Sequence, residues 1–460
     1  DSVIDMAREL ELVETTPPTV NSDEEQRENP HASQRHLYIS SCVSKIKIVM
    51  AAWQIASSTD TVLPHVYFPV NFASIARAIS SVLGLGIFEF TSANCILRWS
   101  YFERHVFTTL APLAVVTLGT VLYWLVRRVR GELETIADRR RVGAHILYGT
   151  LFSIFVVLPS VSTAVISFFH CSRFDRGSFL PDARIMTVEP SIRCGGRRYR
   201  RWIVYNTLML LVWPVGTPLV MASFLWKNRG KLNPALPSTI DAVRTDVQME
   251  HHGTTEEEAK CADSRETQQA DVPVERDPAP PAADAESADA FQRVHRRYTD
   301  SLKELAKLKI RESDESVAGL TFLFAEYEPR CYLFPIFEIY RRLFLMSVLT
   351  VLYRATAKQV VIGLLGSLVS YVVFAHYKPY VEDDDDIVST VAQAEVVLTY
   401  CGAIAVYAAD VSDEGTFSSS GFGVVLIMVF ISSFLVATYR TVLEAVSHLC
   451  KKRTRLGVFG

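Results

Sequence analysis

Long stretches without a charged side chain alternate with polar segments along this chain. Residues 142–169, 202–226, 359–377 and 421–439 contain no Asp, Glu, Lys or Arg. A helix needs about 20 apolar residues to cross the hydrocarbon core of a bilayer, which is about 30 Å thick. Backbone groups there must be hydrogen-bonded within the segment, so these stretches are predicted to be membrane-spanning helices.

Less pure apolar stretches complete the predicted architecture, an all-α polytopic membrane bundle of about eight transmembrane helices with a disordered cytoplasmic loop. The first bundle, residues 37–226, has predicted spans at 37–58, 105–126, 142–169 and 202–226. The second bundle, residues 321–445, has predicted spans at 331–353, 359–377, 387–409 and 421–442. The first span contains Lys45 and Lys47, which we expect to extend to a headgroup interface.

The polar segments divide into linkers and one amphipathic helix. Residues 1–36 and 227–320 are predicted cytoplasmic linkers, and residues 446–460 a basic cytoplasmic tail. Residues 254–290 are acidic and rich in Pro and Ala, which is typical of disorder. Apolar side chains at helical spacing among basic residues predict an amphipathic helix over 291–310. Such a helix suits anionic lipid or calmodulin, or a neighbouring subunit.

Counting of crossings sets the expected topology. With both linkers and the tail in the cytoplasm of a plasma-membrane protein, residues 170–201 lie outside, and residues 68–90 cannot span and are interfacial or re-entrant. Eight arginines in 170–201 oppose this orientation under the positive-inside rule. Cys171 and Cys194 bracket the loop and suit an oxidising compartment, so we expect a disulfide between them; free thiols, or pairing with Cys95, are the alternatives.

Overall composition adds little. The chain has 460 residues, 49% of them hydrophobic, and a formal net charge of −3 whose contributions are unevenly placed. It begins at Asp1 without an apolar leader, so we expect further sequence upstream. No nucleophile elbow, HExxH or phosphate-binding loop is visible, and the cysteines lack metal-ligand spacing. We therefore expect no enzymatic activity, cofactor, metal or nucleic acid.

An ordered series of motifs resembles one family. The motifs are KIKIVMAAWQI (45–55), VYFPVNF (66–72), the bracketing pair Cys171 and Cys194 with Tyr199, WPVGTPLVMASFLWKNR (213–229), LTFLFAEYEPRCYLFPIFEIYRRLFL (320–345), then Gln359 and HYKPY (376–380). Together they resemble the transmembrane module of the TRP-like (TRP C-terminal domain) proteins of protists and algae, which are distantly similar to fungal TRP-like and flavin-carrier membrane proteins.

The resemblance extends over most of residues 40–445 and implies a cation-channel role. The arginine-rich outer loop and the glutamate within 387–409 depart from the family's pattern. Two other functions stay open: a membrane anchor for an extracellular receptor or adhesion region, and a small-molecule or lipid transporter. In the transporter, Pro214 and Pro218 would break the helix 202–226 at the substrate site.

Charged residues inside the predicted spans are the candidate pore or gating groups, because an unpaired charge in hydrocarbon is unfavourable by several kcal/mol. Glu338 precedes Arg341 and Arg342 by three and four residues, so the three share one helix face. They form either a gating network or an ion pair at the cytoplasmic interface. Glu395 needs a cation, a proton or one of these arginines.

Two clusters of acidic residues lie next to the last two helices, one between them and one before the first of them. Asp410, Asp413 and Glu414 lie between them and would form an outer acidic ring in a homo-oligomer, or else an ordinary solvated turn. The run 383–386 suits the positive N-terminal end of the following helix, or calcium.

Overall fold

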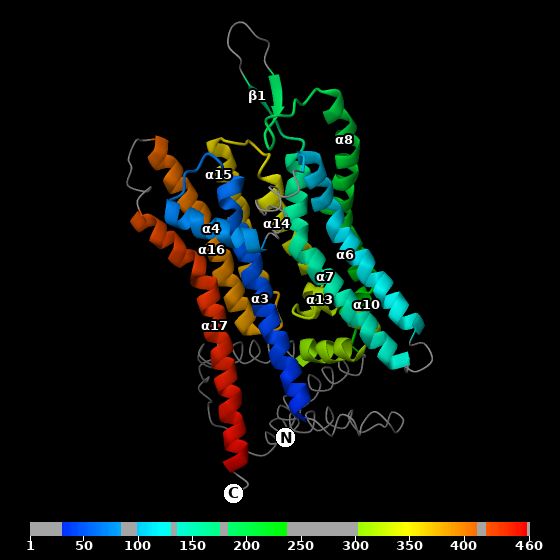
Figure 1. The fold of residues 1–460 in the computed structure, drawn as a ribbon. Helices are drawn as coiled ribbons and strands as arrows, with labels where there is room; N and C mark the ends of the chain where they lie inside the picture. Colours follow the sequence, from blue (N-terminus) through cyan, green and yellow to red (C-terminus); the bar gives the residue numbers. More distant parts are fainter. Residues whose placement is uncertain are drawn as a thin grey trace, which may run out of the picture.

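The structure is a computed structural model that describes residues 30–83, 99–129, 136–174, 183–236, 302–411 and 420–457. The predicted disordered segment 254–290, Cys95, Asp413 and Glu414 lie outside the described residues. So do 1–29 of the first linker and 291–301 of the predicted amphipathic helix. Residues 302–313 of that region are helical, and this helix lies across one end of the molecule (Figure 1).

The described chain is almost entirely helical. Its first half contains α3 (Pro30–Val62), α4 (Val70–Leu83), α6 (Tyr101–Val129), α7 (Ile136–Ser167), β1 (Cys171–Phe174), β2 (Ala183–Met186), α8 (Arg197–Leu210), the π-helix η3 (Leu211–Gly216), α9 (Thr217–Lys227) and α10 (Arg229–Leu232). Its second half contains η4 (Glu315–Leu320), α13 (Thr321–Phe324), η5 (Pro329–Cys331), α14 (Phe334–Leu343), the π-helix η6 (Phe344–Val348), α15 (Ala357–Tyr377), α16 (Asp383–Val411) and α17 (Ser420–Gly457).

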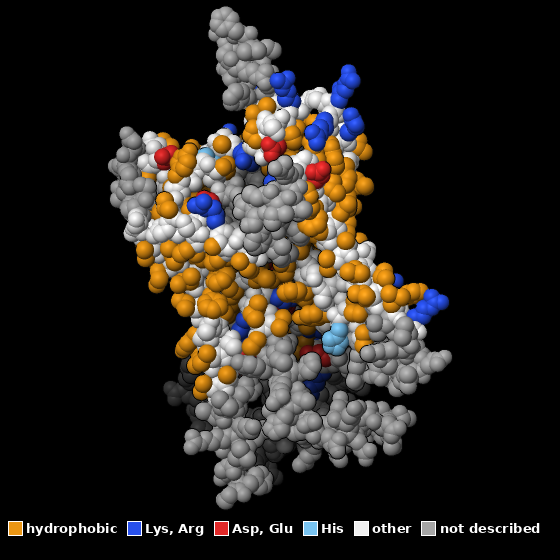
Figure 2. Space-filling view, viewed as in Figure 1, with side chains coloured by type: hydrophobic (Ala, Val, Ile, Leu, Met, Phe, Trp, Pro, Cys, Tyr) orange, Lys and Arg blue, Asp and Glu red, His pale blue; other side chains and the backbone are white. Residues whose placement is uncertain are grey.

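Within the described ranges, six helical segments are long and apolar enough to cross a membrane, which supports a multi-pass membrane protein. They are Tyr101–Leu122, Val142–Ser167, Arg197–Lys227, Ala357–Tyr377, Asp383–Val411 and Ser420–Ser447. Each overlaps one of the predicted spans. Hydrophobic side chains cover the middle of the face seen in Figure 2, and lysines and arginines gather near the β-hairpin end. This is the surface expected of a protein solvated by lipid around its middle.

The other two predicted spans do not qualify by length and composition. Helix α3 is 33 residues long, but its polar side chains lower its hydropathy. Within 331–353, α14 has 10 residues and η6 adds five before the chain turns. At 1.5 Å per residue the combined helix is about 22 Å long, too short to cross alone. Helix α4, in the predicted interfacial segment 68–90, has 14 residues.

Among the described residues, two large hydrophobic cores organise the helices. One is built from α3, α4, η6, α15, α16 and α17, and the other from α7, the α8–η3–α9 segment, α13 and α14. A small third cluster contains Phe102, Phe168, Met186 and Tyr199. The sequence division into bundles 37–226 and 321–445 therefore does not coincide with the packing, because α3 and α4 pack with the C-terminal helices (Figure 1). Helices α3, α7 and α14 meet between the two cores.

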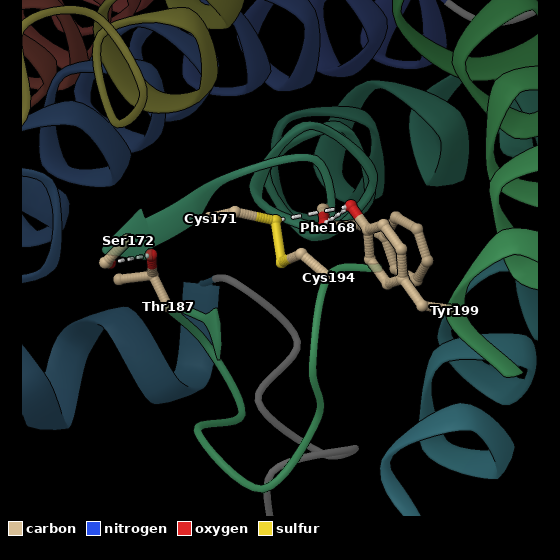
Figure 3. Close-up of a disulfide and its surroundings, with 6 residues drawn as sticks. All are labelled: Phe168, Cys171, Ser172, Thr187, Cys194 and Tyr199. Atoms are coloured by element: carbon tan, nitrogen blue, oxygen red, sulfur yellow. Dashed lines mark hydrogen bonds between the residues drawn. A yellow bond between two sulfur atoms is a disulfide. The ribbon is translucent and has the colours of Figure 1, made fainter. Parts of the chain in front are cut away.

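The two ends of the molecule differ. Strands β1 and β2 form an antiparallel hairpin at one end, while α3 begins and α17 finishes at the other (Figure 1). A disulfide joins Cys171 to Cys194, as the sequence predicted, with the Cα atoms 6.3 Å apart. The Tyr199 hydroxyl lies 3.6 Å from the Cys171 sulfur and donates a hydrogen bond to the Phe168 carbonyl (Figure 3). The disulfide thus ties the hairpin to the start of α8.

Breaking the disulfide should destabilise the hairpin end. The bond closes a loop with a sequence separation of 23, and loops of this size are stabilised by about 3 kcal/mol in the chain-entropy description. Cys171→Ser with Cys194→Ser should lower the thermal unfolding midpoint of the detergent-solubilised chain. The same midpoint for the variant and the parent, together with free thiols at both cysteines in non-reducing peptide mapping, would contradict the assignment.

Close packing of α15 on α16 requires a glycine. A Cβ atom on Gly363 would overlap the ring of Tyr400, whereas one on Gly119 of α6 would meet nothing within 4 Å. Small residues allow this kind of approach between membrane helices. Gly363→Leu should therefore destabilise the protein by about 1–3 kcal/mol.

Thermal unfolding in detergent measures this effect, and Gly119→Leu is the matched control. The control should leave the midpoint within error of the parent. An equal loss of stability in the two variants would contradict the α15–α16 contact as its cause.

Candidate functional site

Helix α14 presents two different faces. Leu333, Ile336, Phe337 and Tyr340 recur at spacings of three and four along one face and line surface grooves. Glu338, Arg341 and Arg342 occupy the other face and are 5%, 5% and 0% exposed. The second face is therefore enclosed by protein rather than by headgroups, and the structure brings the three predicted charged residues together.

Glu338 and Arg341 form a two-pronged ion pair. Arg341 Nε donates to Glu338 Oε2 at 2.9 Å and Nη2 donates to Oε1 at 2.7 Å. The remaining Nη1 donates to Gln393 Oε1 of α16 at 2.8 Å. Paired, planar hydrogen bonds of this kind are the strong form of a charge interaction. The hydrogen bond from Arg341 to Gln393 connects α14 to α16.

Arg342 joins α14 to the other core through a carbonyl that proline leaves free. Pro159 of α7 has no N–H, so the Phe155 carbonyl loses its helical partner. Arg342 Nη1 donates to that carbonyl at 3.2 Å, and its guanidinium lies 3.6 Å from the centre of the Phe155 ring. Nη1 also donates to Gln54 Oε1 of α3 at 2.9 Å. The arginine thereby links three helices.

Gln54 completes the same junction. Its amide nitrogen donates to the Val156 carbonyl at 3.2 Å, so α3 also contacts the α7 backbone beside the proline. Arg342 Nε lies 3.9 Å from Glu338 Oε1, which places one carboxylate between two arginines. The sequence carries two signals for this network: Pro159 within an apolar run, and Gln54 and Gln393 within predicted spans. Neither signal alone predicts that these residues meet Arg341 and Arg342.

Lys45 is the centre of a second charged cluster that the sequence analysis missed. Its ammonium lies 3.2 Å from Glu382, 3.2 Å from Asp385 and 3.4 Å from Glu444, and the side chain is 2% exposed. The expectation that Lys45 extends to a headgroup interface is wrong, because three carboxylates from α16, α17 and the segment before α16 surround it. The cluster fastens α3 to the C-terminal helices.

Lys47 is also enclosed rather than interfacial. It is 2.7 Å from Glu326 Oε1, donates to the Phe322 carbonyl at 2.8 Å and lies 4.0 Å from the Phe322 ring centre. Burial raises the pKa of Glu326, and the nearby Lys47 ammonium opposes this rise. The pair joins α3 to the segment after α13.

Two of the resembling motifs meet beside this pair. Tyr327 and Tyr380 form an isolated antiparallel bridge, with their ring centres 5.1 Å apart. Arg311, 1% exposed, donates to the Tyr327 carbonyl at 2.8 Å. Glu328 N–H donates to the Pro379 carbonyl at 2.9 Å. The segments 320–345 and 376–380 are thus joined through their backbones at the end where α3 begins.

Glu395 differs from every other buried carboxylate among the described residues. It is 1% exposed in the middle of α16, and neither of its oxygens accepts a hydrogen bond of normal geometry. Ser433 of α17 faces it. Neither Arg341 nor Arg342 pairs with Glu395 in the structure. Arg341 binds Glu338 and Gln393. Arg342 binds Gln54 and the Phe155 carbonyl.

The remaining predicted acidic residues lie apart from this site. Asp410 is exposed at the end of α16, away from the α14 charges. The acidic run 383–386 forms the first turn of α16. Asp384 lies 3.1 Å from Arg440, and Asp385 contacts Lys45. Asp386 accepts a hydrogen bond from the Tyr380 N–H at 3.3 Å. Within the described ranges, no three His, Cys, Asp or Glu side chains are arranged to hold a metal ion.

The two prolines of the predicted kink lie at a local change of helix type. Pro214 is inside the π-helix η3, and Pro218 is in the first turn of α9. The Thr217 hydroxyl donates to the Val212 carbonyl at 3.0 Å. A side chain thereby satisfies a backbone group where the regular helical ladder is interrupted, as membrane helices require.

No family model, curated protein or solved structure matches the chain. Among the described residues, the arrangement provides one buried carboxylate without a cationic partner, between α16 and α17, and an arginine network at the junction of the two cores.

Removing Glu338 should be strongly destabilising. Glu338→Gln leaves Arg341 and Arg342 buried without a counter-charge, and breaking a buried pair in this way destabilises by about 3–5 kcal/mol. Thermal unfolding of the detergent-solubilised protein measures the loss. Arg330→Gln is the control: it removes the more exposed pair of Arg330 with Glu328, which should change stability by less than about 1 kcal/mol. Equal effects would contradict a central role for Glu338.

Proposed function

We propose that this chain is the transmembrane module of a TRP-like cation channel, and that Glu395 is the group with which the permeating cation interacts. The observation that carries the proposal is the buried Glu395 carboxylate, which faces Ser433 across α16 and α17 without a protein cation. A charge in this position needs a cation, a proton or water. The ordered motifs of the sequence support the same family and function.

The arginine network suits a gating role in this proposal. Gln393, two residues before Glu395, accepts a hydrogen bond from Arg341. A shift of α14 would therefore act on the α16 turn that carries Glu395. The π-helix η6 follows α14 directly, and π-turns are frequent where helices change conformation at functional sites. We place the hairpin outside, and the first linker, residues 227–320 and the C-terminal tail in the cytoplasm of the plasma membrane.

Replacing Glu395 should reduce cation conductance without unfolding the protein. A carboxylate attracts a cation about 8 Å away by about 2 kcal/mol at an effective dielectric constant of about 20, so Glu395→Gln should lower unitary conductance about thirtyfold. Because this carboxylate has no protein partner to lose, the fold should persist. Single-channel recording of the reconstituted chain is the measurement.

Two variants control this experiment. Glu395→Asp keeps the charge and should retain most of the conductance. Asp410→Asn, at the exposed end of α16, should change the current only at low ionic strength, where surface charges are poorly screened. Unchanged conductance in Glu395→Gln would remove Glu395 from the ion path.

A membrane anchor is the second candidate function. The Lys45 cluster fastens α3 to the C-terminal helices, and Arg342 joins α14 to α3 and α7, which is the property that a rigid anchor needs. Absence of cation flux from proteoliposomes that contain correctly folded, disulfide-bonded protein would favour this function over the channel.

A further inference from the structure

A groove on the lateral surface lies between α9 and α14. Its volume is about 800 Å³, and its walls include Leu219, Ala222, Trp226, Leu333, Ile336 and Tyr340. Ligand pockets typically measure about 300–1,000 Å³. The lining is almost wholly apolar along the part of α9 that belongs to a membrane-spanning segment, so the groove opens toward the hydrocarbon region of a bilayer.

Positive charge lies at one end of this groove. Lys227 lines it, and Arg229 follows two residues later; both side chains are exposed. Neither forms an ion pair with another described residue, in contrast to Lys231, which is 3.6 Å from Asp314. The Arg229 guanidinium lies 5.1 Å from the centre of the Trp226 ring. An exposed tryptophan beside basic residues marks the headgroup level of a bilayer.

We propose that this groove is a binding site for one anionic phospholipid. An acyl chain lies against the Leu219–Trp226 face of α9 and the Leu333–Tyr340 face of α14, and Lys227 and Arg229 bind the phosphate and the anionic headgroup. The charge complementarity decides the class of lipid, because a zwitterionic headgroup leaves one of the two cations without a counter-charge.

The site has a direct connection to the charged network. The groove residues of α14 lie on the helix face away from Glu338 and Arg342, with Arg341 between the two faces. Phe337 and Tyr340 also line a second groove of about 440 Å³, which α14 and η6 form with α15 and which Arg341 borders. A bound lipid therefore supports the side of α14 that protein leaves uncovered. The lipid site does not depend on the proposed conduction.

Native mass spectrometry of the detergent-purified full chain tests the proposal. The probes are palmitoyl-oleoyl phosphatidylserine and phosphatidylcholine with the same acyl chains. We expect one phosphatidylserine to be retained in preference to phosphatidylcholine. Lys227→Gln and Arg229→Gln should each weaken phosphatidylserine binding about fivefold, and Ala222→Phe should abolish it by filling the groove.

The control is Lys358→Gln, which removes an exposed lysine at the start of α15 and should leave lipid binding unchanged. Lys227→Gln and Arg229→Gln change exposed side chains, so they test the headgroup contact even if Ala222→Phe fails to fold. The proposal is overturned if the two lipids bind equally, if Lys358→Gln weakens binding as much as Lys227→Gln, or if folded Ala222→Phe protein retains the lipid.

Discussion

A charged side chain that is withdrawn from water needs a partner, and the helical arrangement of this protein depends on how that requirement is met for Arg341 and Arg342. Glu338 lies between the two guanidiniums on the same helix face. Arg341 Nη1 donates to Gln393 on α16, and Arg342 Nη1 donates to Gln54 on α3 and to the Phe155 carbonyl on α7. One short helix thus carries the polar groups that connect the two hydrophobic cores.

The proline at 159 shows how backbone and side-chain chemistry combine here. A proline inside a membrane helix frees a carbonyl that hydrocarbon cannot satisfy. That carbonyl becomes an acceptor for Arg342, so a local defect in α7 is also a point of attachment for α14. The Lys45 cluster likewise satisfies a buried charge by joining helices. At the end where α3 begins, carboxylates of the last two helices bind the buried Lys45 ammonium. Glu395 alone departs from this pattern among the buried carboxylates described, and we therefore associate it with a ligand rather than with the fold.

The sequence predicted the membrane class, six of the spanning helices and the Cys171–Cys194 disulfide, because runs without charge and a bracketed outer loop are local signals. It did not predict which helices pack together. Helix α3 was assigned to the first bundle by its position, but Lys45, Lys47 and Gln54 bind partners hundreds of residues away. That α14 is too short to span could be recognised in part from the sequence. Pro335 lies in its first turn, and the charges at 338, 341 and 342 leave only 343–353 as an uncharged run. The spatial neighbours of Glu395 depend on long-range packing and had no local signal.

The most direct measurement of the central claim is the access of water to position 395. In a background in which every native cysteine except the disulfide-bonded Cys171 and Cys194 is replaced, Glu395→Cys would be treated with a small, positively charged thiol reagent. Modification would be followed by mass spectrometry and by the current. If Glu395 faces a cation path, the introduced thiol reacts and the attached positive charge blocks the current. A thiol at 395 that stays unmodified in functional, reconstituted protein would contradict the assignment of Glu395 to an ion path.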